Sequence, residues 1–314
     1  MPILDAHHDL GHAHGGDPAW SESYYFNGYS PDSGLGFFAR IAIRANEPFV
    51  DGFITLWLPD GRTLRLTEAR ASRVPEAGTP VLDRLAATRV AAMQCWQLSA
   101  EGSSECGVPL ALSLEFTSLT PAIGVDAPVT PGATVTAALG SGHFEQAGRW
   151  QGRCVIDGQV LPFAGRGNRD KSWGPRRTDH GGGLRYWRWF SMNFGDELHL
   201  GGIRVGAGEA TTQRGWLYRG GAFVSLRALS VQTTYASDGL AQSRVVLTAR
   251  DKDGGAHSFH GEVLRTARLY ARGHEHLAIV EGLTRWRYED LVGYGICEFA
   301  HRLDAAGQPL VTPD

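Results

Sequence analysis

Residues 165–177 read Gly-Arg-Gly-Asn-Arg-Asp-Lys-Ser-Trp-Gly-Pro-Arg-Arg. This stretch places an Arg–Asp pair, a tryptophan and three glycines in the middle of a β-rich chain, and we interpret it as a loop. A carboxyl group held beside an apolar wall has a raised pKa and can act as an acid. The alternative is that the Arg–Asp pair and the tryptophan close the end of a barrel.

Period-two alternation dominates the chain on both sides of this stretch. Residues 110–117 alternate Leu or Phe with Ala, Ser, Glu and Thr, and residues 35–45 place Ala39, Ile41 and Ile43 on one face. Such alternation predicts strands with one buried face. Asp-Gly turns, as at 156–159, predict hairpins between them. Only Pro80–Met93 predicts a helix, so we expect an all-β fold of antiparallel barrels or sandwiches.

Length and composition limit the possible functions. The chain has 314 residues, 42% of them hydrophobic, and a net charge of −3. This suits two medium domains, with the boundary near residue 165, giving domains 1–165 and 166–314. The charge does not favour nucleic acid or an anionic membrane surface as a partner. With no signal peptide, no long apolar run and no CxxC pair, we expect a cytoplasmic protein with reduced cysteines.

The N-terminal run is rich in possible metal ligands. Its histidines and aspartates are Asp5, His7, His8, Asp9, His12 and His14. Their spacing is compatible with a divalent metal. Chain ends are commonly solvated and disordered, so the sequence favours a solvated tail and we predict no metal site.

Aromatic segments surround two further carboxylates. If 20–27 is a strand, Glu22 shares a face with Trp20, Tyr24 and Phe26, where it either pairs with an arginine such as Arg40 or faces a cavity. Glu298 lies in a similar segment near the C-terminus, four residues after Tyr294.

The most apolar segment runs from Tyr186 to Phe194 and predicts a strand with two large apolar faces. Tyr186 and Phe190 fall on one face, and Trp187 and Trp189 on the other. Packing against a second sheet explains this pattern, and so does a cavity for a hydrophobic ligand.

No GxGxxG before a helix, no P-loop and no GxSxG motif occurs. Nucleotide-dependent and serine-hydrolase chemistry are therefore not expected. We predict no organic cofactor. Carboxylates and aromatic residues around apolar surface suit acid-initiated chemistry on alkenes, or binding alone.

Residues 167–174 resemble the Arg-Asp-His-Ser-Trp-Gly motif of the lipocalin-like superfamily that includes hydroxyneurosporene synthase (carotenoid 1,2-hydratase) and the AttH-like proteins. Residues 20–26, 34–44 and 293–298 resemble the opening and closing segments of a bacterial branch of that group. The resemblance implies two lipocalin-like β-barrels or half-barrels packed side by side, with a hydrophobic cavity. It also implies hydration of an isoprenoid double bond, or pericyclic cyclisation as in fungal relatives.

The motif aspartate corresponds to Asp170, which the resemblance implies is the proton donor. Lys171 stands where the family usually has histidine. A lysine beside Asp170 would lower the carboxyl pKa, unless the stretch is a strand that points Lys171 to the opposite face.

Three hypotheses follow. In the first, the chain is a cofactor-independent hydratase in which Asp170 protonates an isoprenoid-like alkene, Glu22 or Glu298 orients water, and Arg169 positions the loop. Its cavity side chains would be Trp173, Tyr24, Tyr186, Trp187, Trp189, Phe190 and Tyr294, with the tryptophans stabilising a carbocation. In the second, the cavity templates cyclisation or isomerisation of a polyene. In the third, the chain carries a hydrophobic metabolite without catalysis.

Overall fold

The computed structural model describes residues 1–47, 49–71, 78, 80–127, 140–176, 184–207, 210–269 and 276–310. Their regular structure is one 3-10 turn, η1 (Ala6–Asp9), and antiparallel β-strands. The described residues form two compact units, the first holding those up to 176 and the second 184–310. The all-β prediction, with a barrel and a half-barrel, is confirmed.

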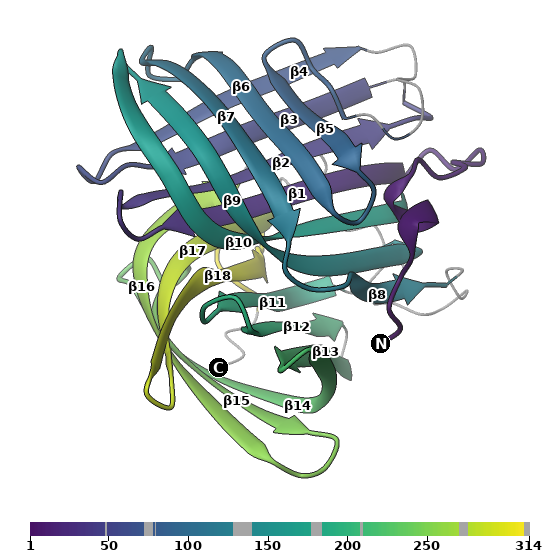
Figure 1. Ribbon diagram of the computed structural model, residues 1–314. Helices are drawn as coiled ribbons and strands as arrows, with labels where there is room; N and C mark the ends of the chain where they lie inside the picture. Colours follow the sequence, from purple (N-terminus) through teal and green to yellow (C-terminus); the bar gives the residue numbers. More distant parts are fainter. Residues whose placement is uncertain are drawn as a thin grey trace. The chain divides into compact units, whose positions relative to one another are not determined.

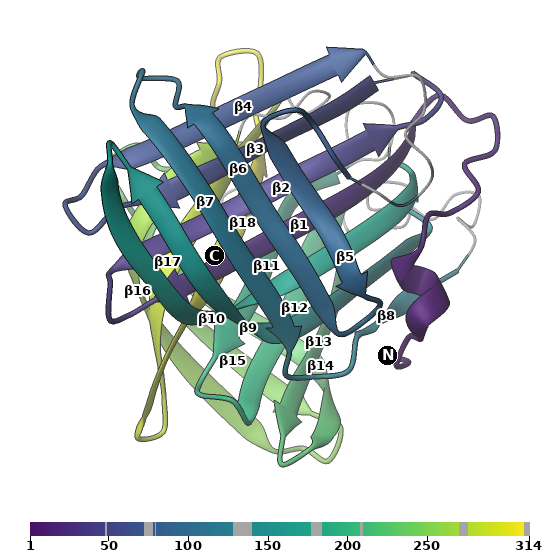
Figure 2. The same cartoon turned by 45° about the horizontal axis from the view of Figure 1, so that its top comes forward.

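One curled sheet makes up the first unit (Figure 1). Its strand order is β4-β3-β2-β1-β10-β9-β7-β6-β5, and β8 pairs with β9. The strands are β1 (Trp20–Ser30), β2 (Leu35–Arg44), β3 (Phe49–Trp57), β4 (Thr63–Ala71), β5 (Leu85–Ala91), β6 (Cys95–Ser103), β7 (Pro109–Ser118), β8 (Ile123–Asp126), β9 (Gly142–Ile156) and β10 (Gln159–Pro175). Figure 2 shows β5, β6 and β7 crossing in front of β1 to β4, so the sheet curls over on itself.

The side chains inside this half-barrel come from alternate positions of its strands. Leu110, Leu112, Leu114 and Phe116 of β7 are at most 4% exposed and belong to one hydrophobic core with residues of β1 to β6. The alternation read from the sequence is therefore confirmed. The two end strands, β4 and β5, share no backbone ladder, but the carboxylate of Glu68 accepts the backbone N–H groups of residues 83 and 84.

A tight hairpin joins β9 to β10. Asp157 and Gly158 have φ angles of 50° and 78°, the left-handed values that a type I′ turn needs, as the Asp-Gly pair predicts. From this turn β10 runs without interruption to Pro175, pairing with β9 on one side and β1 on the other. Residues 165–175 are therefore a strand, not the expected loop. The boundary expected at residue 165 falls inside β10, and the first unit extends to Arg176.

The helix expected over Pro80–Met93 is wrong. This stretch contains β5, which pairs with β6 from Leu85 to Ala91. Its inward side chains Leu85 and Ala87 are buried. Pairing with β6 and this burial override the local helix preference of the stretch, which is weak.

The second unit is a closed barrel of eight strands in chain order (Figure 1). They are β11 (Leu184–Asn193), β12 (Leu198–Ala207), β13 (Ala210–Arg219), β14 (Ala222–Tyr235), β15 (Gln242–Asp251), β16 (Ala256–Leu269), β17 (Leu277–Tyr288) and β18 (Leu291–Arg302). Phe190, Met192 and Phe299 belong to its core. The described residues contain no helix long and apolar enough to span a membrane, and the four cysteines are free.

A polar cluster lies within this barrel. Arg188 and His301 are both fully buried; the guanidinium of Arg188 donates to the carbonyl of Ala300 at 3.1 Å and to the hydroxyl of Tyr235 at 3.0 Å. Among the described residues, neither ring nitrogen of His301 has a hydrogen-bond partner. Burial, and then the charge of Arg188, lowers the pKa of His301 to about 4.

We predict that this histidine makes the protein sensitive to acid. Because the folded-state pKa is below the ordinary value of about 6.5, its contribution to stability is present above that pH and is lost as the pH falls toward 4. Between pH 7 and pH 5 the wild type should lose about 2 kcal/mol of unfolding free energy more than His301→Gln. Calorimetric unfolding of both proteins at the two pH values measures this difference. Equal pH dependence would contradict it.

Candidate active site

The two faces of β10 carry two different groups of charged side chains. Arg169, Lys171 and Trp173 point toward the core of the half-barrel, where Arg169 lies 5.4 Å from the ring of Trp96. Asp170 points to the opposite face because successive strand residues alternate. The prediction that a strand would separate Lys171 from Asp170 is thus confirmed.

On the outer face, Asp170 pairs with a histidine. His143 of β9 lies opposite Ser172 in the β9–β10 register, and its Nε2 lies 2.7 Å from Oδ2 of Asp170. The two side chains are 26% and 19% exposed, so solvent or a small molecule reaches both. Burial lowers the pKa of His143, but the charge and hydrogen bond of Asp170 outweigh this and raise the pKa above its ordinary value. Asp170 thus favours the protonated form of His143, and this polar partner takes the place of the apolar wall that the sequence suggested beside Asp170.

Polar side chains of β1 share this face with Asp170. They occupy every second position, namely Ser21, Ser23, Tyr25 and Asn27, and Tyr25 is directly opposite Asp170 in the register. Asn27 is 1% exposed; its Oδ1 accepts the backbone N–H of Asn168 at 3.2 Å. Within the described residues, Asn27 Nδ2 and Ser21 Oγ are buried without a hydrogen-bond partner. Unsatisfied buried donors are costly to a folded protein.

Glu22 lies on the inner face and is bound by Lys171 and His12. Its Oε1 is 2.9 Å from Nζ of Lys171 and 2.9 Å from Nδ1 of His12, and it is not paired with Arg40. Arg40 instead contacts Ser23 and Asp51 on the other face. Burial raises the pKa of Glu22, but the bonds from His12 and Lys171 hold it below its ordinary value.

Lys171 fastens the N-terminal segment to the half-barrel. Besides Glu22, its ammonium donates to the backbone carbonyls of His8, at 2.9 Å, and Leu10. Burial lowers its pKa against the opposing effect of Glu22. The ring of His12 stacks on Trp173 with centroids 4.0 Å apart, and Gly142 makes room, because a Cβ there would lie 2.0 Å from the indole.

Arg169 is paired with Asp9 rather than with its sequence neighbour. Both side chains are almost fully buried, and the guanidinium binds both carboxylate oxygens, at 2.8 and 3.1 Å. The indole N–H of Trp96 and the backbone N–H of Met93 also donate to Asp9. Burial raises the pKa of Asp9, but Arg169 and these donors lower it overall. The N-terminal run is thus anchored in the unit and is not the solvated tail that we expected.

A groove of about 430 Å³ adjoins this buried network. Gln146 lines it, and the Oε1 of Gln146 accepts from Nε of Arg169 at 2.7 Å. The other lining residues are Leu4, Asp5, Ala6, Ala92, Met93, Gln94, Ser118, Leu119, Thr120, Pro121 and Ala122.

The remaining predicted site residues belong to the second unit and divide between its two faces. Phe190 belongs to the core of the barrel, and alternation places Tyr186 on the same face. Trp187, Trp189, Tyr294 and Glu298 are on the outer face, where the indole N–H of Trp187 donates to Glu298. The predicted residues therefore do not line one common cavity within either unit.

Titration of His143 tests the electrostatics of its pair with Asp170. We expect an NMR titration midpoint above 6.5 in the wild type and a lower midpoint in Asp170→Asn, because that variant removes the carboxylate charge. The stability that the pair contributes is present below about pH 6.5 and is lost as the pH rises through the midpoint. Asp60→Asn, at an exposed site, is the control. An unchanged midpoint in Asp170→Asn would contradict the pairing.

The chain matches one protein family in sequence and several solved structures in fold. A family model described as a domain of unknown function, DUF7064, matches residues 5–303. No curated protein matches the chain. Three solved structures of low sequence identity share the fold, which is the lipocalin-like one that the sequence resembles.

One is an AttH-like protein (NE1406) from Nitrosomonas europaea, with a TM-score of 0.67 and 15% identity over 89% of this chain and 92% of that one. Another is kievitone hydratase from Nectria haematococca, with a TM-score of 0.64 and 11% identity over 95% of this chain and 93% of that one. The third is CghA with Sch210972, with a TM-score of 0.62 and 15% identity over 90% of this chain and 88% of that one.

Proposed function

The chain belongs to the DUF7064 family, and we propose that it is a hydro-lyase that adds water to, or removes it from, a carbon–carbon double bond. The observation that carries the proposal is the His143–Asp170 pair, held at 2.7 Å and partly exposed on a polar face of the first unit. The similarity in fold to a hydratase supports this class of reaction.

In the proposed hydration, the imidazolium of His143 is the acid and Asp170 orients it. Since Nε2 is held by Asp170, the proton on Nδ1 of His143 passes to one alkene carbon, and the oxygen of a water molecule bonds to the other carbon. The proton that the water loses returns to the His143–Asp170 pair, so that no proton is gained or lost overall. Dehydration follows the same steps in reverse.

The polar face favours a substrate with oxygen substituents. An imidazolium is a weaker acid than a neutral carboxyl group, so the double bond must be activated, as by conjugation to a carbonyl or an electron-rich ring. We therefore propose an apolar, isoprenoid-like or aryl-bearing substrate that carries oxygen near its double bond.

Four of the predicted site residues take a structural role in this proposal. Glu22, Arg169 and Trp173 bind the N-terminal segment on the inner face together with Lys171. The fourth, Tyr24, packs beside Lys171, whose Nζ is 5.2 Å from its ring. None of them is proposed to touch the reacting atoms.

The test is incubation with unsaturated compounds in ¹⁸O-labelled water, read by mass spectrometry. The panel contains isoprenoids with and without oxygen and alkenes conjugated to carbonyl or aryl groups. Incorporated ¹⁸O that disappears in His143→Gln supports the hydro-lyase. An isomeric product without label indicates the cyclase or isomerase instead, and bound ligand without product indicates a carrier.

A further inference from the structure

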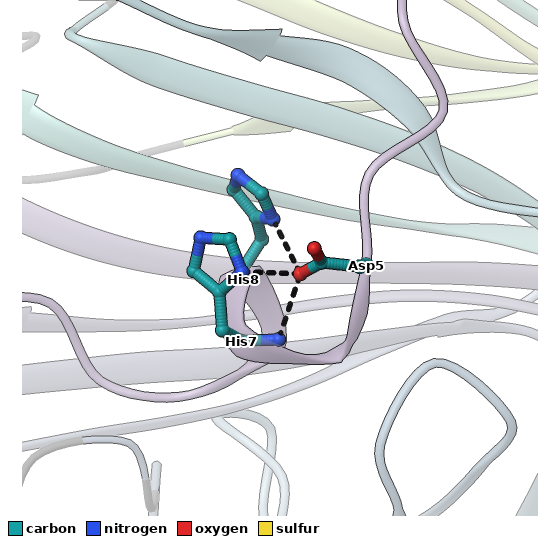
Figure 3. Close-up of side chains that lie close together, drawn as sticks. All are labelled: Asp5, His7 and His8. Carbon is teal, nitrogen blue, oxygen red and sulfur yellow. Dashed lines mark hydrogen bonds and ion pairs between the residues drawn. The ribbon is translucent and has the colours of Figure 1, made fainter.

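Two histidine nitrogens converge on one carboxylate oxygen at the start of the chain, outside the proposed catalytic pair. Figure 3 shows the rings of His7 and His8 turned toward the carboxylate of Asp5. Nδ1 of His7 and Nδ1 of His8 both contact Oδ1 of Asp5, the latter at 3.2 Å. All three ligand atoms lie within 4.8 Å of one another.

The local backbone explains how adjacent histidines reach the same point. Asp5 is the N-cap of η1, and its Oδ1 accepts the backbone N–H of His7 at 3.1 Å. The tight turn that follows brings the centroids of the two imidazole rings to 3.7 Å from each other. An N-cap requires only that the Asp5 carboxylate accept one backbone N–H group. Capping therefore does not explain why two imidazole nitrogens also converge on the same oxygen.

A second carboxylate orients the more buried histidine. The side chain of His8 is 10% exposed, and its Nε2 lies 3.5 Å from Oδ2 of Asp126 in β8. An Nε2–H group directed at a carboxylate leaves the Nδ1 lone pair available to a metal, and metal-bound histidines are commonly held in this way. The neighbouring β8 strand thus supplies an outer partner that a chance surface cluster would lack.

We propose that Asp5, His7 and His8 form a binding site for a divalent transition-metal ion of the zinc type. Two imidazoles and one carboxylate are a ligand set that zinc takes with a fourth position left to water or another ligand. The side chains of Asp5 and His7 are 73% and 66% exposed, so the ion has access from solvent. Asp5 also lines the groove of about 430 Å³, which places the site at the edge of that groove.

The site is directly joined to the anchor of the N-terminal segment. Asp9 follows His8 in the same turn and binds Arg169, and the carbonyl of His8 accepts from Lys171. A metal bound to residues 5, 7 and 8 would therefore hold the turn in the conformation that these two cations also require.

The experiment is a Zn²⁺ titration of the full chain without a polyhistidine tag, in competition with a chromophoric chelator. We expect one ion per chain and X-ray absorption showing two imidazole ligands with Zn–N distances of about 2.0–2.1 Å. His7→Gln changes an exposed side chain, and Asp5→Asn keeps an N-cap residue, so both should fold. Each should weaken binding at least about ten-fold, and Asp126→Asn about ten-fold.

His14→Gln is the matched control, because His14 belongs to the same segment but bonds to Asn46 and Gly15. It should bind Zn²⁺ as the wild type does. Absence of saturable binding, unchanged affinity in His7→Gln, or equal weakening in His14→Gln would each overturn the proposal. Because the readout is metal binding, its failure is independent of whether the chain is a hydro-lyase.

Discussion

Replacing Asp9 by asparagine is expected to lower the free energy of unfolding of the first unit by about 3–5 kcal/mol. The substitution leaves the guanidinium of Arg169, which is 1% exposed, without its charge partner. An uncompensated buried charge is far more costly than a lost surface ion pair, because the desolvation cost remains while the Coulomb attraction is gone. Calorimetry of the full chain should show the unfolding transition of this unit lower by about 10 °C.

The control is Asp60→Asn, which breaks an ion pair with Arg62 whose side chains are about half exposed, at 48% and 53%. It should cost no more than about 1 kcal/mol. Changing Asp9 to Leu and Arg169 to Met together should recover only part of the loss, since it removes the uncompensated charge but leaves the indole N–H of Trp96 and the backbone N–H of Met93 without their acceptor. A small effect of Asp9→Asn alone would show that Arg169 is solvated or paired otherwise.

Loss of the proton donor should have the largest effect on turnover. His143→Gln is expected to reduce kcat about 10²–10⁴-fold for the hydration identified in the labelling experiment, the usual contribution of a positioned general acid. Asp170→Asn retains the imidazole but lowers the pKa of His143. Its activity should therefore decline at a lower pH than that of the wild type, because the imidazolium is lost earlier.

The second unit offers a matched control. His257 and Asp251 form a similar pair, 3.1 Å apart, with side chains that are each 15% exposed. His257→Gln removes an imidazole from a comparable environment and should leave kcat and the pH profile unchanged. If it reduced turnover as much as His143→Gln, or if His143→Gln remained fully active, the assignment of the acid would be wrong.

Local pattern predicted several of the strands, but it did not predict the C-terminal part of the longest one, β10. Alternation identified β7 with its buried face, because burial on one side of a sheet is a period-two signal. It also located β2, although that strand is buried on both faces and not on the one face that the pattern predicts. It missed that 165–175 continues β10, because both faces of that stretch carry polar and charged side chains. Such a pattern resembles a loop, although neighbouring strands satisfy its backbone.

Of the candidate site, the sequence predicts only the residue positions that the register of the β9–β10 hairpin determines. The Asp157–Gly158 turn defines the β9–β10 register, and counting back from it places His143 diagonally across from Asp170. This register is a signal that the sequence contains. The Asp9–Arg169 pair joins residues 160 positions apart, and no local spacing indicates it.

The place of β1 in the sheet has a consequence for synthesis of the chain. β1 pairs with β2 on one edge and with β10 on the other, and β10 ends only at Pro175. Because synthesis proceeds at about 5–20 residues per second, the edge of β1 that pairs with β10 stays unpaired for on the order of ten seconds, until β10 has left the ribosome. During that interval its unpaired N–H and C=O groups are open to other strands. A nascent chain stalled before residue 159 therefore keeps this edge of β1 unpaired, and we expect it to aggregate more readily than a chain that has completed β10.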